Sequence, residues 1–416
     1  MSAAIAAKTA GADVGLCERT DMLLGAGLVG GIMRNNGRLI ATGEAIAMGF
    51  GDLFHLTESA SRHKNIAFPG HKHASLYDVM FMEPLVRRLL ESMGIAVYSG
   101  QRVVRLISAE AKILSVESEI GDRFHADSFV DATGSSGPPG QCARFGNGCA
   151  CCIQRCPSYG PRVSLTSLLG LPEFMCTRRA GNYGAMSGSC KLHKESLSQD
   201  IASRLDAEGV VVVPLPKSFV NASKLATKVC QQYALPEYAE NIVLLDTGHA
   251  KLMSPFFPLS QLRSLEGFEN ARYADPLAGD RGHSIRLTAI SPRDDFLKVD
   301  GAQNLFVGGE RVGVCVGHTE AIVTGAVAGR NAALQAYGKP LTALPTSMAT
   351  GDFIARSGIG PDGSSRVPGG YGLQASHTFA GSVYFQRMKD MGLYVPDLGA
   401  IARRVRDEAM ENAFLT

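Results

Sequence analysis

The sequence predicts an α/β protein built on a Rossmann-like parallel sheet with flanking helices, discontinuous in sequence. An inserted α+β domain and a C-terminal helical tail complete this predicted fold. Short apolar strands are expected at residues 14–17, 128–130 and 304–307, and each ends at an acidic residue or at glycine, as strands of such sheets do beside a ligand. A helix rich in small residues follows over 319–338. The 47 glycines among 416 residues suit the tight turns of this class.

These elements divide the chain into four expected parts. They are residues 1–140, the first part of the nucleotide-binding domain; 141–295, an inserted cysteine-rich substrate domain; 296–340, the last part of the nucleotide-binding domain; and 341–416, a C-terminal extension. Within the first part, residues 51–75 are polar with scattered histidines and are expected to form a helix and a loop. The apolar spacing over 77–94 predicts an amphipathic helix.

The chain begins with what would be the second half of a dinucleotide-binding βαβ unit. Residues 2–9 predict a helix and residues 14–17 a strand, and Glu18 stands at the end of that strand, where an acidic residue binds a ribose. The first strand and the glycine-rich turn should precede this helix. We therefore expect that Met1 is an internal methionine and that roughly fifteen residues are missing before it.

Two later segments carry further nucleotide-binding features. Asp131-Ala132-Thr133-Gly134 ends a strand where the backbone must turn past a ligand, and Gly308-Gly309-Glu310 ends another. A helix is expected to start near Gly317-His318-Thr319, where unpaired N–H groups and the positive end of the helix dipole attract an electron-rich ligand atom. The order and spacing of these segments together indicate one nucleotide site.

This arrangement resembles the FAD-binding domain of the glutathione-reductase-like flavoprotein superfamily. Within it, the sequence is most similar to the FAD-dependent oxidoreductases related to the glucose-inhibited division protein A group. The resemblance lies within residues 1–140 and 295–336, in the stretches CERTDMLLGAGLVGG, YDVMFMEPLVRRLLESMGIAVY, FVDATGSSG and LFVGGERVGVCVGHTEAIVTGAVAGRNAA.

The resemblance implies FAD as the cofactor and gives each motif a role. The adenosine ribose would lie on Glu18 and the flavin ring at the helix start, where His318 would act as the catalytic residue by stabilising reduced flavin or passing a proton, unless it only caps the helix. The phosphates would lie near the missing glycines, without which FAD binding would be weakened, and near Gly30 and Gly31. Many relatives carry Asp where this chain has Glu310. The implied cofactor-binding residues are Glu18, Arg19, Gly30, Gly31, Ala132, Thr133, Gly134, Gly308, Gly309, Glu310, Gly317, His318, Thr319, Glu320 and Ala321.

Seven of the ten cysteines fall within residues 142–190. The spacing Cys149-x-x-Cys152-x-x-x-Cys156-Pro157 is typical of the end of a bacterial ferredoxin motif. The fourth thiolate of a [4Fe–4S] cluster could come from Cys142, Cys151, Cys176 or Cys190, and Cys142 is the one we assign. A structural zinc site, a redox-active thiol pair and ordinary buried cysteines are the alternatives. A cluster would relay single electrons to a flavin.

Charge and hydropathy exclude several functions. The 41 basic and 39 acidic residues give a net charge of +2, so a nucleic-acid partner is not expected from composition. No apolar run is long enough to cross a membrane, and Lys8 and Asp13 interrupt the N-terminal apolar stretch, which indicates a cytoplasmic protein.

The leading hypothesis is therefore an FAD-dependent oxidoreductase that transfers hydride through flavin N5 and is coupled to an iron–sulfur cluster. Its partners would be a small-molecule substrate or a redox partner protein, and a homo-oligomer is compatible with the sequence. One alternative, implied by the resemblance to the glucose-inhibited division protein A group, is a flavin-dependent enzyme that modifies transfer RNA at uridine. Another is a non-catalytic subunit of a redox complex that holds zinc or a cluster.

Overall fold

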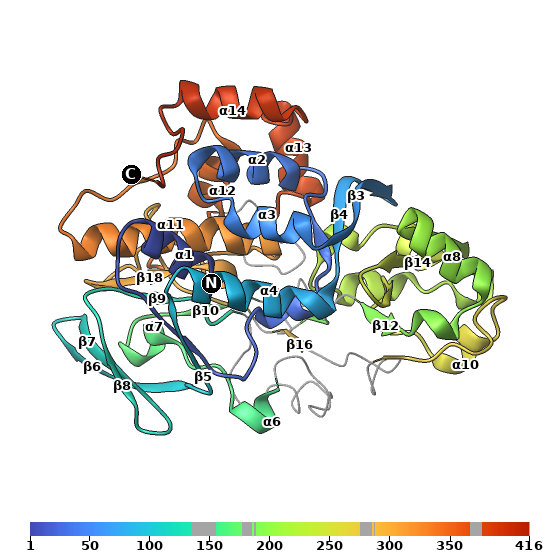
Figure 1. The fold of residues 1–416 in the computed structure, drawn as a ribbon, viewed down its shortest axis with the longest axis horizontal. Helices are drawn as coiled ribbons and strands as arrows, with labels where there is room; N and C mark the ends of the chain where they lie inside the picture. Colours follow the sequence, from blue (N-terminus) through green and yellow to red (C-terminus); the bar gives the residue numbers. More distant parts are fainter. Residues whose placement is uncertain are drawn as a thin grey trace.

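Two parallel pairs of strands lie in the main body of the protein (Figure 1). The computed structural model describes residues 1–134, 155–176, 185–186, 189–274, 285–286, 288–366 and 377–415. Strand β1 (Gly15–Glu18) pairs with β5 (Ala96–Ser99), and β9 (Phe129–Asp131) pairs with β18 (Leu305–Val307). These pairs and the helices around them confirm the α/β class that the sequence predicts.

Helix α1 (Ser2–Thr9) lies against α11 (His318–Ala336), the long helix that follows β18 (Figure 1). A Cβ placed on Gly329 would come within 2.0 Å of the carbonyl oxygen of Ala3, so the two backbones touch at this point. The Ser2 hydroxyl donates to the carbonyl of Ile322 at 2.6 Å. The small residues that both helices share are therefore what allows this close approach.

The C-terminal helices belong to the main core and pack on α2. These helices are α2 (Arg38–Met48), α12 (Ala349–Ser357), α13 (Ser382–Asp390) and α14 (Leu398–Asp407). The buried Glu44 carboxylate of α2 accepts from the backbone N–H groups of Ala349 at 2.9 Å and Thr350 at 2.8 Å, which caps the start of α12. Ile401 of α14 is completely buried in the same core as α2. The helical C-terminus was predicted, but its burial against α2 was not.

A fully buried arginine, Arg293, ties α12 to the loop that follows β18. Its guanidinium donates to the carbonyls of Val312 at 3.0 Å and Ile354 at 2.6 Å, and to the Ser357 hydroxyl at 3.0 Å. Burial lowers the pKa of Arg293 to about 10, so it remains charged at neutral pH.

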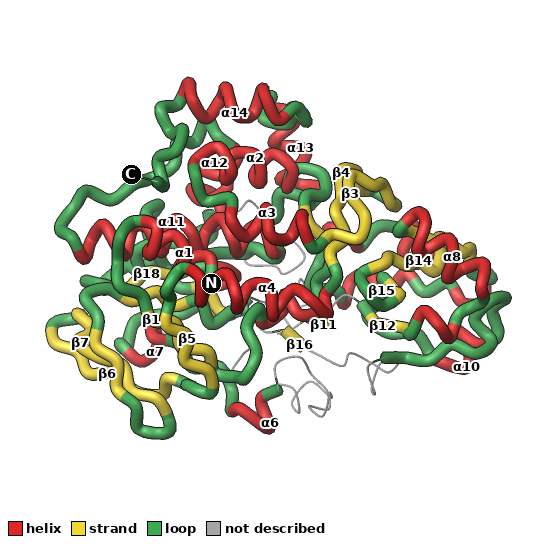
Figure 2. Tube along the Cα trace, viewed as in Figure 1, coloured by secondary structure: helices red, strands yellow, loops and turns green. Residues whose placement is uncertain are grey.

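The segment after α3 (Asp52–Ser59) corrects one prediction. A helix and a loop were expected over 51–75, but the helix ends at Ser59 and the chain forms a hairpin of β3 (Ser61–Phe68) and β4 (His71–Tyr77). Strand β2 (Ile32–Met33) completes this sheet beside β4. Figure 2 shows the β3–β4 hairpin. The register of β3 shifts at several points, which breaks the alternation of polar and apolar residues that would have revealed a strand.

The predicted amphipathic helix is present, and an antiparallel sheet follows it. Helix α4 (Val79–Ser92) precedes β5, and β6 (Val103–Ala109), β7 (Lys112–Ser118) and β8 (Arg123–His125) form an antiparallel sheet before β9. Among the described residues, no helix combines the length and apolar character needed to cross a bilayer.

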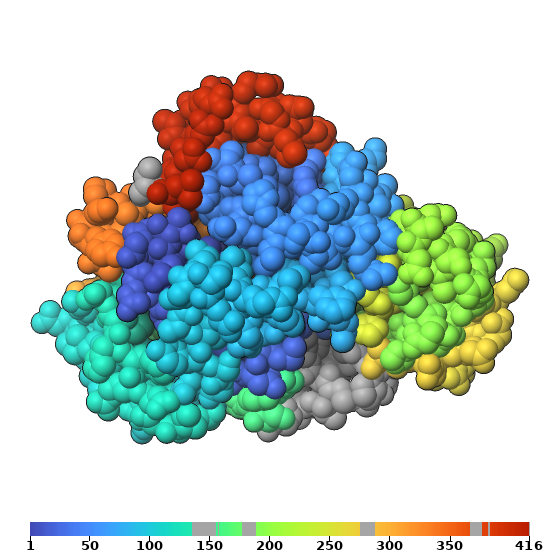
Figure 3. Space-filling model, in the orientation of Figure 1, coloured from blue at the N-terminus to red at the C-terminus, as the bar shows by residue number. Residues whose placement is uncertain are grey.

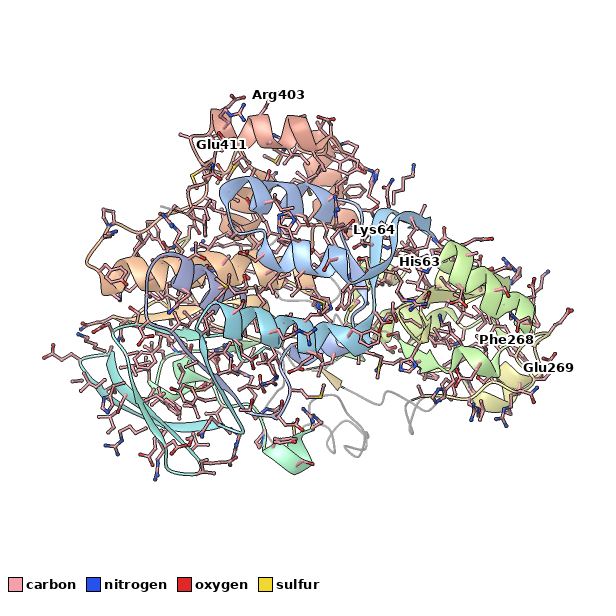
Figure 4. The ribbon with its side chains drawn as sticks, in the orientation of Figure 1. His63, Lys64, Phe268, Glu269, Arg403 and Glu411 are labelled. Carbon is pink, nitrogen blue, oxygen red and sulfur yellow. The ribbon has the colours of Figure 1, made fainter. Side chains whose placement is uncertain are left out.

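The inserted region has its own four-stranded antiparallel sheet and forms a lobe at one side of the molecule (Figure 3). Its elements are β12 (Cys190–Leu192), α8 (Gln199–Glu208), β13 (Val210–Pro214), α9 (Glu237–Glu240), β14 (Asn241–Asp246), β15 (Ala250–Leu252) and α10 (Leu259–Arg263). Arg62 and His63 of β3 reach the buried Asp246 carboxylate at 2.8 and 2.9 Å and join this lobe to the main body; Figure 4 labels His63.

Short elements connect these larger ones. They are η1 (Gly25–Leu28), α6 (Cys156–Tyr159), α7 (Leu165–Leu168), β10 (Phe174–Met175), β11 (Ala185–Met186), η2 (Lys194–Ser196), η3 (Lys217–Phe219), η4 (Ala222–Thr227), η5 (Gln231–Tyr233), β16 (Ile285–Arg286), β17 (Ala289–Ile290) and η6 (Gly309–Arg311).

Candidate functional site

The end of β18 and the start of α11 are held together by close backbone contact. A Cβ on Gly308 would lie 3.1 Å from the Cα of Gly325, so a larger residue would press the strand end against the helix backbone. The Gly309 N–H donates to the Thr324 hydroxyl at 3.0 Å. The predicted residues Gly308, Gly309 and Ala321 therefore come together: a Cβ on Gly309 would lie 3.8 Å from the Ala321 Cβ.

The first turn of α11 is fixed by a buried ion pair. Arg38 Nε lies 3.1 Å from both carboxylate oxygens of Glu320, and the two side chains are 4% and 1% exposed. The Phe379 N–H also donates to Glu320 Oε1, at 3.0 Å. A Cβ on Gly317 would come within 1.9 Å of Glu320 Oε2, so the residue before the helix must be glycine. The Glu320 side chain thus holds the helix start in place, which leaves its backbone N–H as the part that could meet a ligand.

His318, the predicted catalytic residue, packs over a buried tyrosine and over residues 25–31, which we call the glycine loop. A Cβ on Gly30 would come within 2.1 Å of His318 Nε2, and the Tyr77 ring lies edge-on to the imidazole at 6.4 Å. The Tyr77 hydroxyl donates to the Gly27 carbonyl at 2.9 Å, and burial raises its pKa to about 12. Gly31 faces Thr247 instead. Gly30 therefore lies beside His318 at the helix start.

Glu18 stands at the end of β1, as predicted, and one of its carboxylate oxygens accepts hydrogen bonds from within the chain. Its Oε1 accepts from the Thr20 backbone N–H at 2.8 Å and from the Thr20 hydroxyl at 3.0 Å. Within the described part of the chain, Oε2 accepts no hydrogen bond. Arg19 points elsewhere: its Nη1 lies 3.7 Å from Cys156 Sγ and also donates to the Gly160 carbonyl.

The turn after β9 is shaped by Asp131. Its Oδ1 accepts from the Thr133 N–H at 3.1 Å and from the Thr133 hydroxyl at 2.6 Å. Ala132 lies within this turn, and Gly134 follows at φ +73°, with no atom of the described residues within 4 Å of the position of a Cβ. The backbone thus leaves β9 through a left-handed glycine, a conformation that L side chains rarely adopt.

Arg311 links the two strand ends at this site. It is fully buried, and its Nε lies 3.3 Å from Asp131 Oδ1, while its Nη2 contacts Glu173 and donates to the Ser164 hydroxyl at 2.7 Å. Burial opposes ionisation of Asp131, yet the guanidinium groups of Arg311 and Arg162 hold the pKa of that carboxyl below its ordinary value.

Sequence reasoning missed Arg38, Tyr77 and Arg311 as residues that build the site. Arg311 directly follows Glu310, so its place after the glycines was a usable signal. The pairing of Arg38 with Glu320 joins positions far apart in the chain, and nothing in the local pattern around either residue announces it.

Two features fit a bound dinucleotide such as FAD. Thr319 Oγ1, in the first turn of α11, is buried and has no hydrogen-bond partner in the described part of the chain. Glu18 Oε2, at the end of β1, also accepts no hydrogen bond from the described residues. In this position of a nucleotide-binding sheet, a carboxylate oxygen accepts a hydrogen bond from a ribose hydroxyl. The residues present therefore fit the cofactor.

The four predicted metal ligands are only partly described. Cys142, Cys149 and Cys152 lie outside the described residues, and Cys156 begins the short helix α6. Among the described residues, no group of three or more histidine, cysteine, aspartate or glutamate side chains is arranged to hold a metal ion. The cluster therefore stays a prediction.

Comparisons with known proteins identify the family and the fold. The family model described as "Glucose inhibited division protein A" matches residues 1–251 and 247–340. The structure of Aquifex aeolicus GidA in its form II crystal is 15% identical, with a TM-score of 0.59 over 98% of this chain and 74% of that chain. The form I crystal gives 14% identity and the same TM-score over 98% and 76%.

The family match defines the protein as an FAD-dependent oxidoreductase. The chain belongs to the glucose-inhibited division protein A family, as its resemblance to that group predicted.

Proposed function

We propose that this protein is an FAD-dependent enzyme that modifies uridine in transfer RNA. The observation that carries the proposal is the family match, which extends over the strand ends and the α11 start described above. It favours the transfer-RNA alternative over the oxidoreductase coupled to a cluster. The net charge of +2 requires that contact with RNA be confined to a local surface.

FAD would be held at three strand or helix ends. Glu18 Oε2 would accept from the adenosine ribose, the glycine turns at Gly134 and Gly309 would let the backbone approach the cofactor, and the α11 start would face the flavin. When bound, the flavin supplies hydride transfer. The Arg38–Glu320 pair would keep the helix start rigid while this happens.

His318 is the residue of this chain that we propose moves a proton. Its ring is held between Gly30 and Tyr77, and imidazole is the side chain whose ordinary pKa suits proton transfer near neutral pH. The Tyr77 hydroxyl keeps the glycine loop in contact with the ring through the Gly27 carbonyl.

Substituting Gly30 by Val is expected to displace the His318 ring, because even a Cβ would lie 2.1 Å from Nε2. The midpoint potential of the bound flavin should shift by about 30 mV, equivalent to about 1.4 kcal/mol for a two-electron couple. Dye-linked reductive titration at several pH values measures it. Gly399→Ala, on α14, is the control and should leave the potential unchanged; an unshifted potential in Gly30→Val would contradict the proposed role.

Glu18→Gln is expected to weaken FAD binding by about ten- to a hundredfold, because a charge-assisted hydrogen bond to the ribose would be lost. Fluorescence quenching of FAD during titration measures the affinity. Glu411→Gln removes a carboxylate that is 40% exposed and paired with Arg406 (Figure 4), so it should not change FAD affinity. Equal affinity in the two variants would exclude Glu18 as the ribose ligand.

Incubating the FAD-loaded protein with transfer RNA tests the substrate. Binding that weakens as salt is raised, together with a change in the uridines detected by nucleoside mass spectrometry, is the expected result. Absence of both salt-dependent binding and altered uridine would reject the transfer-RNA proposal and leave the flavin site intact.

The second candidate adds a [4Fe–4S] cluster held by Cys142, Cys149, Cys152 and Cys156. The observation that favours it is the ferredoxin-like cysteine spacing. Analysis of iron and acid-labile sulfide in anaerobically purified protein tests this candidate. Both should be present in the wild type, and the content of both per chain should be lower in Cys156→Ala. Zinc without iron would support the structural zinc alternative.

A further inference from the structure

A hollow of about 440 Å³ lies between α12 and α13, and no residue of the α11 start lines it. Three arginines from three segments line it: Arg356 of α12, Arg387 of α13 and Arg366 of the intervening chain. The other lining residues are Thr346, Asp352, Ala355 and Met391.

The carboxylate in this lining serves to position two of the arginines. Asp352 is 4% exposed, and it accepts two bonds from Arg387, Nε to Oδ2 at 2.9 Å and Nη2 to Oδ1 at 2.7 Å. Arg356 Nε donates to Oδ1 at 2.9 Å, and the Tyr384 hydroxyl lies 3.1 Å from Oδ2. Asp352 therefore holds two guanidinium groups side by side, and its own charge is already compensated.

The third guanidinium, that of Arg366, is held by residues that precede α11 in the sequence. Arg366 Nη1 donates to Asp295 Oδ1 at 2.6 Å, and Nη2 donates to the Arg293 carbonyl at 3.3 Å. The three arginine side chains are 32–42% exposed, and within the described ranges two carboxylates, Asp352 and Asp295, pair with them. Among the described residues, Nη1 and Nη2 of Arg356 and Nη1 of Arg387 have no acceptor. The hollow thus carries excess positive charge and unused N–H donors.

We propose that this hollow binds a small ligand through a phosphomonoester group. Guanidinium groups bind phosphate oxygens through paired N–H donors, and the volume lies within the range of pockets for small molecules. The arginines converge on one hollow from three segments. A nucleic-acid backbone would instead favour a row of cations along a surface, so a small ligand fits this geometry better. The assignment goes beyond the proposed function and does not depend on it.

Titrating the FAD-loaded protein with inorganic phosphate by calorimetry, at constant ionic strength in chloride, tests the site. One phosphate should bind per chain. Arg356→Gln and, separately, Arg366→Gln should each weaken it by about tenfold, as expected for loss of a charge-assisted hydrogen bond. Arg403→Gln on α14, whose side chain is 67% exposed (Figure 4), should bind phosphate like the wild type.

Two results would overturn the proposal. One is absence of phosphate binding by the wild type, or the same affinity in the Arg356 and Arg366 variants as in the wild type. The other is loss of transfer-RNA binding in both variants with phosphate affinity unchanged, which would assign the arginines to a nucleic-acid surface. Circular dichroism of each variant checks that it is folded, and using two single variants keeps the test decisive if one of them does not fold.

Discussion

Replacing Arg38 by Gln is expected to lower the free energy of unfolding by about 3–5 kcal/mol, the range observed when one member of a buried ion pair is removed. Glu320 would keep its charge in a side chain that is 1% exposed, with the Phe379 N–H as its remaining partner. Arg38 also donates to the Val316 carbonyl at 3.1 Å, directly before the α11 start, so this loop should loosen as well.

Urea unfolding followed by circular dichroism measures this loss. The double variant Arg38→Met, Glu320→Met should recover much of the stability, because neither buried charge remains. Arg403→Gln is the matched control and should change the unfolding free energy by less than about 0.5 kcal/mol. A single variant that unfolds like the wild type would show that the pair does not stabilise the fold.

Acidification is expected to destabilise the protein through His71. This histidine is buried: its Nδ1 accepts from Asn35 Nδ2 at 2.9 Å, and its Nε2 donates to the Gln232 carbonyl at 3.0 Å. Burial lowers its pKa to about 3 from an ordinary 6.5, while the charges of Arg38 and Lys228 act in the same direction. The unfolded chain thus takes up a proton below pH 6.5 that the folded protein does not, so the stabilisation present above pH 6.5 is lost as the pH falls toward 3.

From pH 6.5 to 5 this loss of unfolding free energy amounts to about 1.5 kcal/mol, because a tenfold change in proton affinity corresponds to about 1.4 kcal/mol. Carboxylates titrate in the same range. The informative quantity is therefore the free energy of unfolding of the wild type minus that of His71→Gln, measured by urea unfolding at each pH. The variant should lose less stability on acidification than the wild type. His55→Gln, at an exposed position, should behave like the wild type; parallel curves for wild type and His71→Gln would refute the prediction.

The sequence predicted the elements that local pattern determines. The strand over 304–307, the glycines after it and the small-residue helix are present as β18, Gly308–Gly309 and α11. Glu18 stands at a strand end, as its position after an apolar run implied. These features depend on neighbours in the sequence, so the local order of residues was sufficient to predict them.

Other parts of the site depend on contacts between distant segments. His71 lies in a polar stretch that was expected to be helix and loop, and it is a buried hydrogen-bonded residue of β4. Glu320 was expected to contact the cofactor and Arg38 was given no role, and the fold pairs the two side chains with each other. A buried charge is tolerated only beside its partner, and no local pattern identifies that partner.

The buried Arg293 has a consequence for how the molecule can move. Its guanidinium bonds the loop after β18 and two residues of α12, and its carbonyl accepts from Arg366 at the arginine-lined hollow. If α12 moved without that loop, a charged group would lose its acceptors inside the core. The loop after β18 and the α12 wall of the hollow are therefore constrained to move together, so we expect Arg293→Gln to uncouple them as well as to destabilise the fold.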